Sequence, residues 1–151
     1  MGRILEYSIH DSAAAIGLNL AAKKTIHASP LPPALKQLIE KSGNCQPSRC
    51  FDNSWLLVMK ETIPRAEYVL SLGVRVLPVE HAIICLDGVY YDPTWELHLG
   101  SVGKEYLVVD QWGKDELLSV ARKSPGECGG IYPPMIRHLE KSDHFRNFFK
   151  G

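Results

Sequence analysis

The dipeptide Asp87-Gly88 constrains the fold of this chain more than any other feature. It stands between two runs of β-forming residues, 81–86 (HAIICL) and 89–92 (VYYD). A two-residue Asp-Gly loop between such runs is a strong signal for a tight β-hairpin. The sequence therefore predicts an antiparallel hairpin in which the two runs pair directly across the turn.

Helices are expected before this hairpin and further strands around it. Apolar residues recur at helical spacing, and prolines and glycines interrupt the pattern between elements. The expected helices cover 12–24 (capped by Asp11), 33–42, 50–62 (with Ser48 as a cap) and 114–123. The expected strands cover 68–72, 74–77 and 106–110, the first two being separated at Gly73. After residue 123 the chain is expected to be loop-rich and to close with a polar tail.

This order, helices first and an antiparallel sheet afterwards, predicts an α+β domain with N-terminal helices packed on the sheet. A length of 151 residues fits one domain spanning 1–151, to which residues 1–30 would add an N-terminal helical extension.

Composition excludes several function classes. Lys plus Arg and Asp plus Glu both number 17, so the chain lacks the basic excess that nucleic-acid binding requires. No apolar run approaches the roughly 18 residues of a membrane helix, and no secretory signal is recognised. Four cysteines are too few for a disulfide scaffold in a chain of this size. We expect a cytoplasmic protein that does not bind membranes, nucleic acid or a cofactor.

Three residues carry the pattern of a thiol enzyme. Cys50 falls in the first turn of a predicted helix, where the helix dipole stabilises a thiolate. Extending the hairpin register from its turn makes His81 and Asp92 diagonal neighbours on one face. Cys50 would be the nucleophile, His81 its base and Asp92 the carboxylate that orients the base.

Four further residues are candidates for supporting roles. The backbone amide of Cys50 and a side-chain donor would form an oxyanion hole, with Gln46, Asn44 and Asn53 as the candidate donors. Trp95 lies close to Asp92 in the sequence and is expected to shield the His–Asp pair from water.

The segment from His81 to Trp95 resembles the transglutaminase-like core of the papain-like cysteine enzymes. The resemblance rests on His81-Ala82, Asp87-Gly88 and Asp92-Pro93-Thr94-Trp95, preceded by a helix that starts at Cys50, and it covers residues 44–96. It departs at Ile83, where an aromatic residue is common. The resemblance implies an α+β core with Cys50, His81 and Asp92 as the triad.

The leading hypothesis is a small cysteine-dependent hydrolase or acyltransferase that acts on an amide-type carbonyl of a protein or peptide. Its reaction would be proteolysis, deamidation or transglutamination. The alternative is an inactive effector or inhibitor that uses the same fold to bind a protein partner. A zinc site is disfavoured because His81 and Cys85, although they share a strand face, would stand about 13 Å apart. Cys85 is expected to be a core residue.

Overall fold

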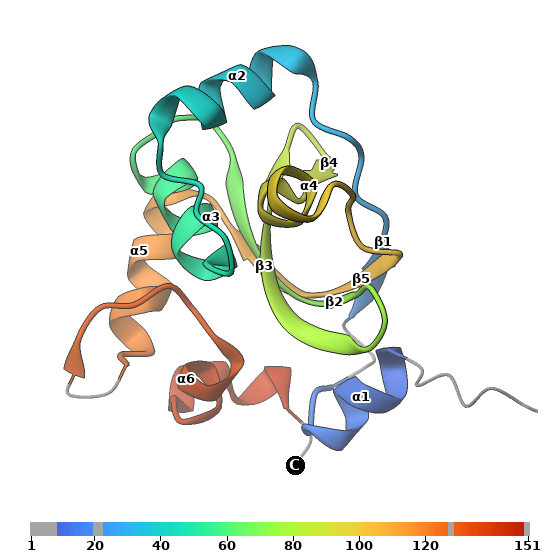
Figure 1. The fold of residues 1–151 in the computed structure, drawn as a ribbon. Helices are drawn as coiled ribbons and strands as arrows, with labels where there is room; N and C mark the ends of the chain where they lie inside the picture. The colour runs from blue at the N-terminus through green and yellow to red at the C-terminus, as the bar shows by residue number, and fades with distance from the viewer. Residues whose placement is uncertain (1–8, 20–22, 127–128, 150–151) are drawn as a thin grey trace, which may run out of the picture.

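The computed structural model describes residues 9–19, 23–126 and 129–149, which fold around a five-stranded antiparallel sheet (Figure 1). The sheet curls into a half-barrel with the strand order β1-β5-β2-β3-β4. The strands are β1 Lys24–Ile26, β2 Glu67–Val74, β3 Pro78–Leu86, β4 Val89–Tyr91 and β5 Glu105–Trp112.

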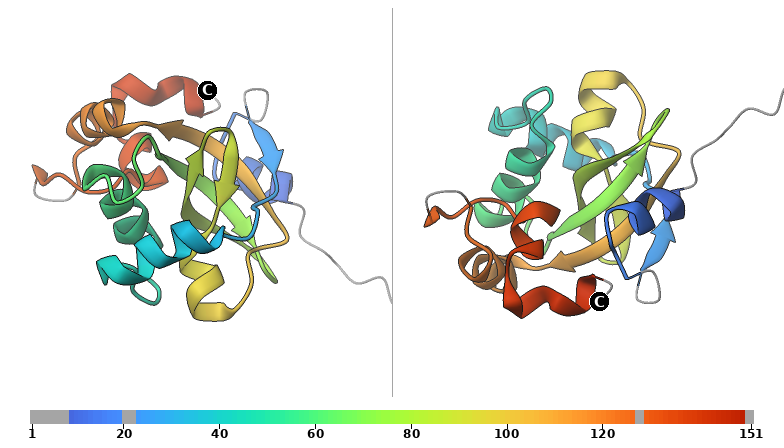
Figure 2. Two further views of the ribbon diagram at one scale, coloured as in Figure 1. Left: turned by 90° about the horizontal axis from the view of Figure 1, so that it is seen from above. Right: turned by 90° about the horizontal axis from the view of Figure 1, so that it is seen from below.

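Helices cover the sheet on several sides. α3 packs on β2 and β3, α4 packs on β3, and both α1 and α5 contact β2 and β5. The two views of Figure 2 show α2, α3 and α4 at one side of the sheet and the C-terminal helices at the opposite side. The helices are α1 Ile9–Ala15, α2 Pro33–Ser42, α3 Cys50–Met59, α4 Pro93–Leu99, α5 Lys114–Lys123, α6 Ile136–Glu140 and a 3-10 helix, Asp143–Phe148.

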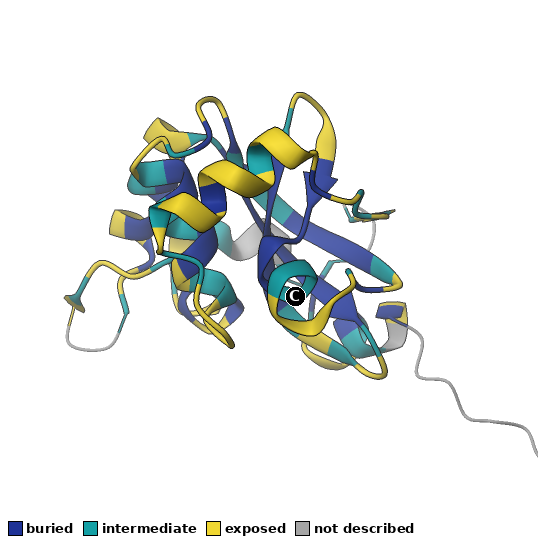
Figure 3. Ribbon diagram, turned by 45° about the horizontal axis from the view of Figure 1, so that its top comes forward, coloured by how far each residue is buried: buried dark blue, intermediate teal, exposed yellow. Residues whose placement is uncertain are grey.

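Side chains on both faces of the central strand β2 are buried. Figure 3 shows that the strands of the sheet are largely buried. Because side chains alternate along a strand, Leu70 and Leu72 enter a large apolar cluster shared with the helices, while Val69 enters a smaller cluster. The smaller cluster consists of Val69, Ile83, Cys85, Tyr90, Tyr106 and Val108, with Trp95 packed against it.

The predicted hairpin is confirmed in its register: Leu86 pairs with Val89 and Cys85 with Tyr90. Both turn residues have positive φ, 51° at Asp87 and 80° at Gly88, which is the geometry of a type I′ turn. Since that turn twists in the same sense as the strands, the local sequence is sufficient to set the register of β3 and β4.

The predicted break at Gly73 is wrong. β2 runs unbroken from Glu67 to Val74, and the chain turns only after it. A Cβ on Gly73 would lie 3.1 Å from ring atoms of both Trp95 and Tyr106. Glycine is therefore present because two aromatic rings pack against the strand at this point, and not because the strand ends.

Three predicted helices are confirmed, with small differences at their ends. α2 covers the predicted residues and ends at Gly43, whose φ is 68°. α5 also covers its predicted range. α3 starts at Cys50 as predicted but ends at Met59, before residue 62. The predicted Ser48 cap is wrong, because Arg49 occupies the N-cap position and no side-chain hydrogen bond caps the helix.

The prediction of one helix over 12–24 is wrong. α1 ends at Ala15, and Gly17 adopts a φ of 83° beyond it. Residues 20–22 lie outside the described part of the chain, and β1 then pairs with β5 at the edge of the sheet. The N-terminal region is thus a helix followed by a strand, since pairing with β5 decides the conformation of 24–26.

Two regions contain helices that were not predicted. α4 begins directly after Asp92, with Pro93 in its first turn. The C-terminal region, expected to be loop-rich, contains α6, which buries Ile136 and Leu139. The α+β class is confirmed.

Among the residues that the structure describes, no helix combines the length and the hydrophobicity that a membrane span needs.

Candidate functional site

Three different elements supply the predicted triad. Cys50 is the first residue of α3 and is partly exposed. His81 lies within β3 and is 2% exposed, and Asp92, which follows β4, is fully buried. Of the three residues, only Cys50 is partly exposed, while His81 and Asp92 are buried.

The imidazole of His81 and the carboxylate of Asp92 are hydrogen-bonded, with Nε2 and Oδ2 2.9 Å apart. The predicted contact across the hairpin is therefore present. Strand pairing ends at Tyr91, and Asp92 turns inward as the N-cap of α4, where its Oδ1 accepts the backbone N–H of Trp95 at 3.2 Å. One carboxylate thus caps a helix and binds the histidine.

The pKa of His81 is raised from 6.5 to about 9. Burial works against protonation and would lower this pKa, but the hydrogen bond to Asp92 and the charge of its carboxylate, with a further contribution from Cys50, outweigh it. Cys50 is the first residue of α3, which packs on β3, the strand that holds His81. Because Nε2 faces Asp92, Nδ1 is the nitrogen left to exchange a proton with sulfur.

Trp95 covers the imidazole of His81. Their ring centroids are 3.8 Å apart and their planes differ by 20°. The guanidinium of Arg75 lies 5.8 Å from the indole centroid and donates to the Ser101 carbonyl at 2.7 Å. The predicted proximity of Trp95 to the His–Asp pair is thus realised as a stack that favours a cationic imidazole.

Tyr106 was not among the predicted site residues. Its hydroxyl donates to Asp92 Oδ2 at 2.5 Å and accepts the backbone N–H of Gly103 at 2.6 Å. Burial, followed by the charge of Asp92, raises its pKa, so the hydroxyl keeps its proton. In the sequence, Tyr106 is marked only as a tyrosine that precedes the aliphatic residues 107–109. That its hydroxyl bonds to Asp92 follows from the strand order and not from the local sequence.

Asn53 fastens the loop that precedes Cys50. Its Oδ1 accepts the N–H of Gln46 at 2.9 Å, and its Nδ2 donates to the Gln46 carbonyl at 2.8 Å and to Thr94 Oγ1 at 3.0 Å. Both amide hydrogens are donated within the protein, so Asn53 could serve an oxyanion only by giving up one of these bonds.

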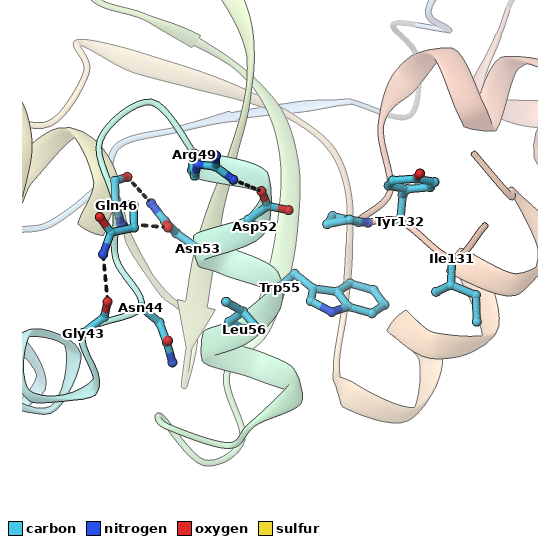
Figure 4. Close-up of a pocket in the computed structure, with 11 residues that line it drawn as sticks. Gly43, Asn44, Gln46, Arg49, Asp52, Asn53, Trp55, Leu56, Ile131 and Tyr132 are labelled. Atoms are coloured by element: carbon cyan, nitrogen blue, oxygen red, sulfur yellow. Dashed lines mark hydrogen bonds and ion pairs between the residues drawn. The ribbon is translucent and has the colours of Figure 1, made fainter. Parts of the chain in front are cut away.

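A pocket of about 580 Å³ lies along α3, and its lining includes the N-cap residue Arg49 and, on the helix itself, Asp52 and Asn53 but not Cys50 (Figure 4). Asn44 and Gln46 lie on one side of the helix, while Trp55 faces the segment 131–133 on the other. Gln46 Nε2 donates to the exposed carbonyl of Gly43 at 2.8 Å, a bond that water can replace. The candidate oxyanion donors therefore line one continuous pocket.

The other cysteines have different surroundings. Burial raises the pKa of Cys45 to about 11 despite a hydrogen bond to Thr94, and burial also raises the pKa of Cys85. Cys85 is 2% exposed in the smaller cluster, which agrees with its predicted core position. Cys128 lies outside the described residues. Cys45 and Cys85 thus offer internal references for the reactivity of Cys50.

Within residues 9–19, 23–126 and 129–149, no three His, Cys, Asp or Glu side chains are grouped so that they could hold a metal ion. Comparison with protein-family models, curated proteins and solved structures found no match to this chain.

Proposed function

We propose that this protein is a cysteine-dependent hydrolase or acyltransferase with a papain-like, transglutaminase-like core, acting on an amide-type carbonyl of a protein or peptide. The hydrogen bond between His81 and Asp92, with the partly exposed Cys50 beside the ring, is the observation that carries the proposal. It supplies a nucleophile, a base and an orienting acid.

In the first half of the reaction, Nδ1 of His81 takes the proton of the Cys50 thiol. The thiolate attacks the carbonyl carbon, and the C–O double bond becomes a single bond to an oxyanion. The C–N bond then breaks, and the departing amine or ammonia takes its proton from the His81 imidazolium. The product is a thioester between the acyl group and Cys50.

In the second half, water or an amine attacks the thioester carbonyl and gives a proton to His81. The C–S bond breaks, and His81 returns the proton to sulfur. Water as acceptor gives a carboxylic acid, and an amine gives a new amide. The negative charge of Asp92 stabilises the imidazolium that appears in both halves.

The first turn of α3 supports stabilisation of the oxyanion. The first N–H groups of a helix have no partner within the helix, and the one on Cys50 lies next to the reacting sulfur. Gln46 and Asn44 are the second donors that we propose. The pocket along α3 would hold the substrate chain, and a reducing compartment such as the cytoplasm would keep Cys50 as a thiol.

A panel of glutamine-containing peptides tests the proposal. Ammonia release is measured with and without hydroxylamine, which converts an acyl-thioenzyme into a hydroxamate. We expect ammonia release from the wild type and from the matched control Cys45→Ala, and no release from Cys50→Ala. Release that persists in Cys50→Ala would refute the proposed nucleophile.

If the protein is instead an inactive effector or inhibitor that binds a partner, these measurements should give a different result. If Cys50 showed no enhanced reactivity and no peptide formed an acyl-enzyme, the inactive effector or inhibitor would be the better account.

A further inference from the structure

We propose that Tyr106 is a positioning residue of the same site, which fixes the Asp92 carboxylate and through it the orientation and basicity of His81. This inference rests on the proposed function for its catalytic consequence, although its structural part stands on the contacts alone. Tyr106 and Asp92 belong to separate elements, β5 and the N-terminus of α4.

Three donors surround the Asp92 carboxylate. Oδ1 accepts the backbone N–H of Trp95, and Oδ2 accepts both His81 Nε2 and the Tyr106 hydroxyl. A fully buried carboxylate needs such partners to remain charged. Since Tyr106 and His81 share one oxygen, the tyrosine determines where that oxygen lies relative to the ring.

The Tyr106 hydroxyl is itself held in place by Gly103. The backbone N–H of Gly103 donates to it at 2.6 Å, which leaves the hydroxyl proton directed to Asp92. A Cβ at Gly103 would lie 2.8 Å from the Trp95 ring and 3.0 Å from the Tyr106 hydroxyl. Glycine at this position therefore lets the Trp95 stack and the Tyr106 bond exist together.

Other charged and titratable groups lie near the hydrogen-bonded set of His81, Asp92 and Tyr106, and they come from three directions. Cys50 acts on His81 from α3, the charge of Asp92 raises the pKa of Cys45 in the loop before α3, and Arg75 acts on Tyr106 from beyond β2. Tyr106 differs from these in donating a neutral hydrogen bond. Its hydrogen bond stabilises the carboxylate anion and makes Asp92 less basic. Asp92 therefore raises the pKa of His81 less than it would without Tyr106.

The test compares Tyr106→Phe with Tyr90→Phe. Tyr90 is a matched control because it lies in the same smaller cluster and its hydroxyl also donates at 2.5 Å, but to Gln111. Two quantities are measured in each full-length variant: the titration of the His81 ring by nitrogen NMR, and the rate of Cys50 alkylation by iodoacetamide across pH.

In Tyr106→Phe we expect the His81 pKa to rise by about half a unit or more, because the carboxylate loses a donor. We expect the alkylation rate to fall about tenfold, because the ring is less firmly oriented. Tyr90→Phe should change neither quantity. A Tyr106→Phe variant that titrates and reacts like Tyr90→Phe would overturn the inference.

A double variant tests whether Tyr106 acts through Asp92. In an Asp92→Asn background, Tyr106→Phe should cause no further shift in His81 and no further loss of rate, and an undiminished additional effect would contradict the inference. The NMR titration does not depend on sulfur reactivity. If wild-type Cys50 proved unreactive, the proposed function would fail while the role of Tyr106 in holding His81 would still be decided.

Discussion

The indole of Trp95 lies 3.8 Å from the imidazole of His81, centroid to centroid, and nearly parallel to it. The stack covers one face of a ring whose edge is already occupied by Asp92. Water therefore has little access to the proton shared by the histidine and the carboxylate.

Replacing Trp95 with alanine should expose that proton. We expect the NMR signal of the His81 Nε2–H to be visible in the wild type and to disappear through solvent exchange in Trp95→Ala. Trp55→Ala is the matched control, because Trp55 is also partly buried but lines the pocket along α3. A signal that persists in Trp95→Ala would show that the indole does not shield the pair.

The raised pKa of His81 makes folding stability depend on pH. The folded-state pKa is about 9, above the 6.5 of an unperturbed histidine. The stabilisation is fully present below pH 6.5 and is lost as the pH rises through about 9. It amounts to up to about 3 kcal/mol. Urea unfolding at pH 6 and pH 10 should show this loss in the wild type and a smaller one in His81→Gln. Equal losses in both proteins would contradict the assignment.

Asn53 should contribute to the free energy of unfolding and not only to the reaction. Asn53→Ala removes three hydrogen bonds and leaves the backbone of Gln46 without its partners, so we expect a loss of about 2 kcal/mol or more in the free energy of unfolding. Asn44→Ala, at a less buried position in the same pocket, should change it by no more than about 0.5 kcal/mol. Comparable urea midpoints for the two variants would disprove the role of Asn53 as a fastener.

Gly103→Ala should disturb the aromatic packing around His81. The added methyl group would meet the Trp95 ring and the Val74 carbonyl, both 2.8 Å away. We expect a lower melting temperature and an altered His81 Nε2–H resonance. In Gly113→Ala, where nothing lies within 4 Å, the resonance should be unchanged. An unchanged resonance in Gly103→Ala would mean that the glycine is not required.

Local sequence was sufficient for the hairpin and for the face on which His81 and Asp92 lie. A type I′ turn at Asp87-Gly88 fixes the pairing of β3 with β4. The pairing ends at Tyr91, however, and Asp92 reaches His81 as the N-cap of α4. The start of α3 at Cys50 was predictable for a similar reason, since the apolar spacing of the helix is a local property.

The rest of the site depends on contacts between distant segments. Tyr106 reaches Asp92 only because β5 pairs with β2 in a particular register, which no local pattern specifies. The predicted break at Gly73 is wrong because the glycine accommodates the rings of Trp95 and Tyr106, which are distant in the sequence. The cap that starts α4 is a local feature, since Asp92 is the N-cap and Pro93 stands in the first turn.

The most direct test of the central claim is the rate at which iodoacetamide alkylates each cysteine at pH 6, measured by mass spectrometry. Cys50 should react on the order of 100-fold faster than Cys45 and Cys85, and His81→Gln should abolish that preference. Equal, slow alkylation of Cys50, Cys45 and Cys85 in the wild type, or a preference that survives His81→Gln, would contradict activation of Cys50 by His81.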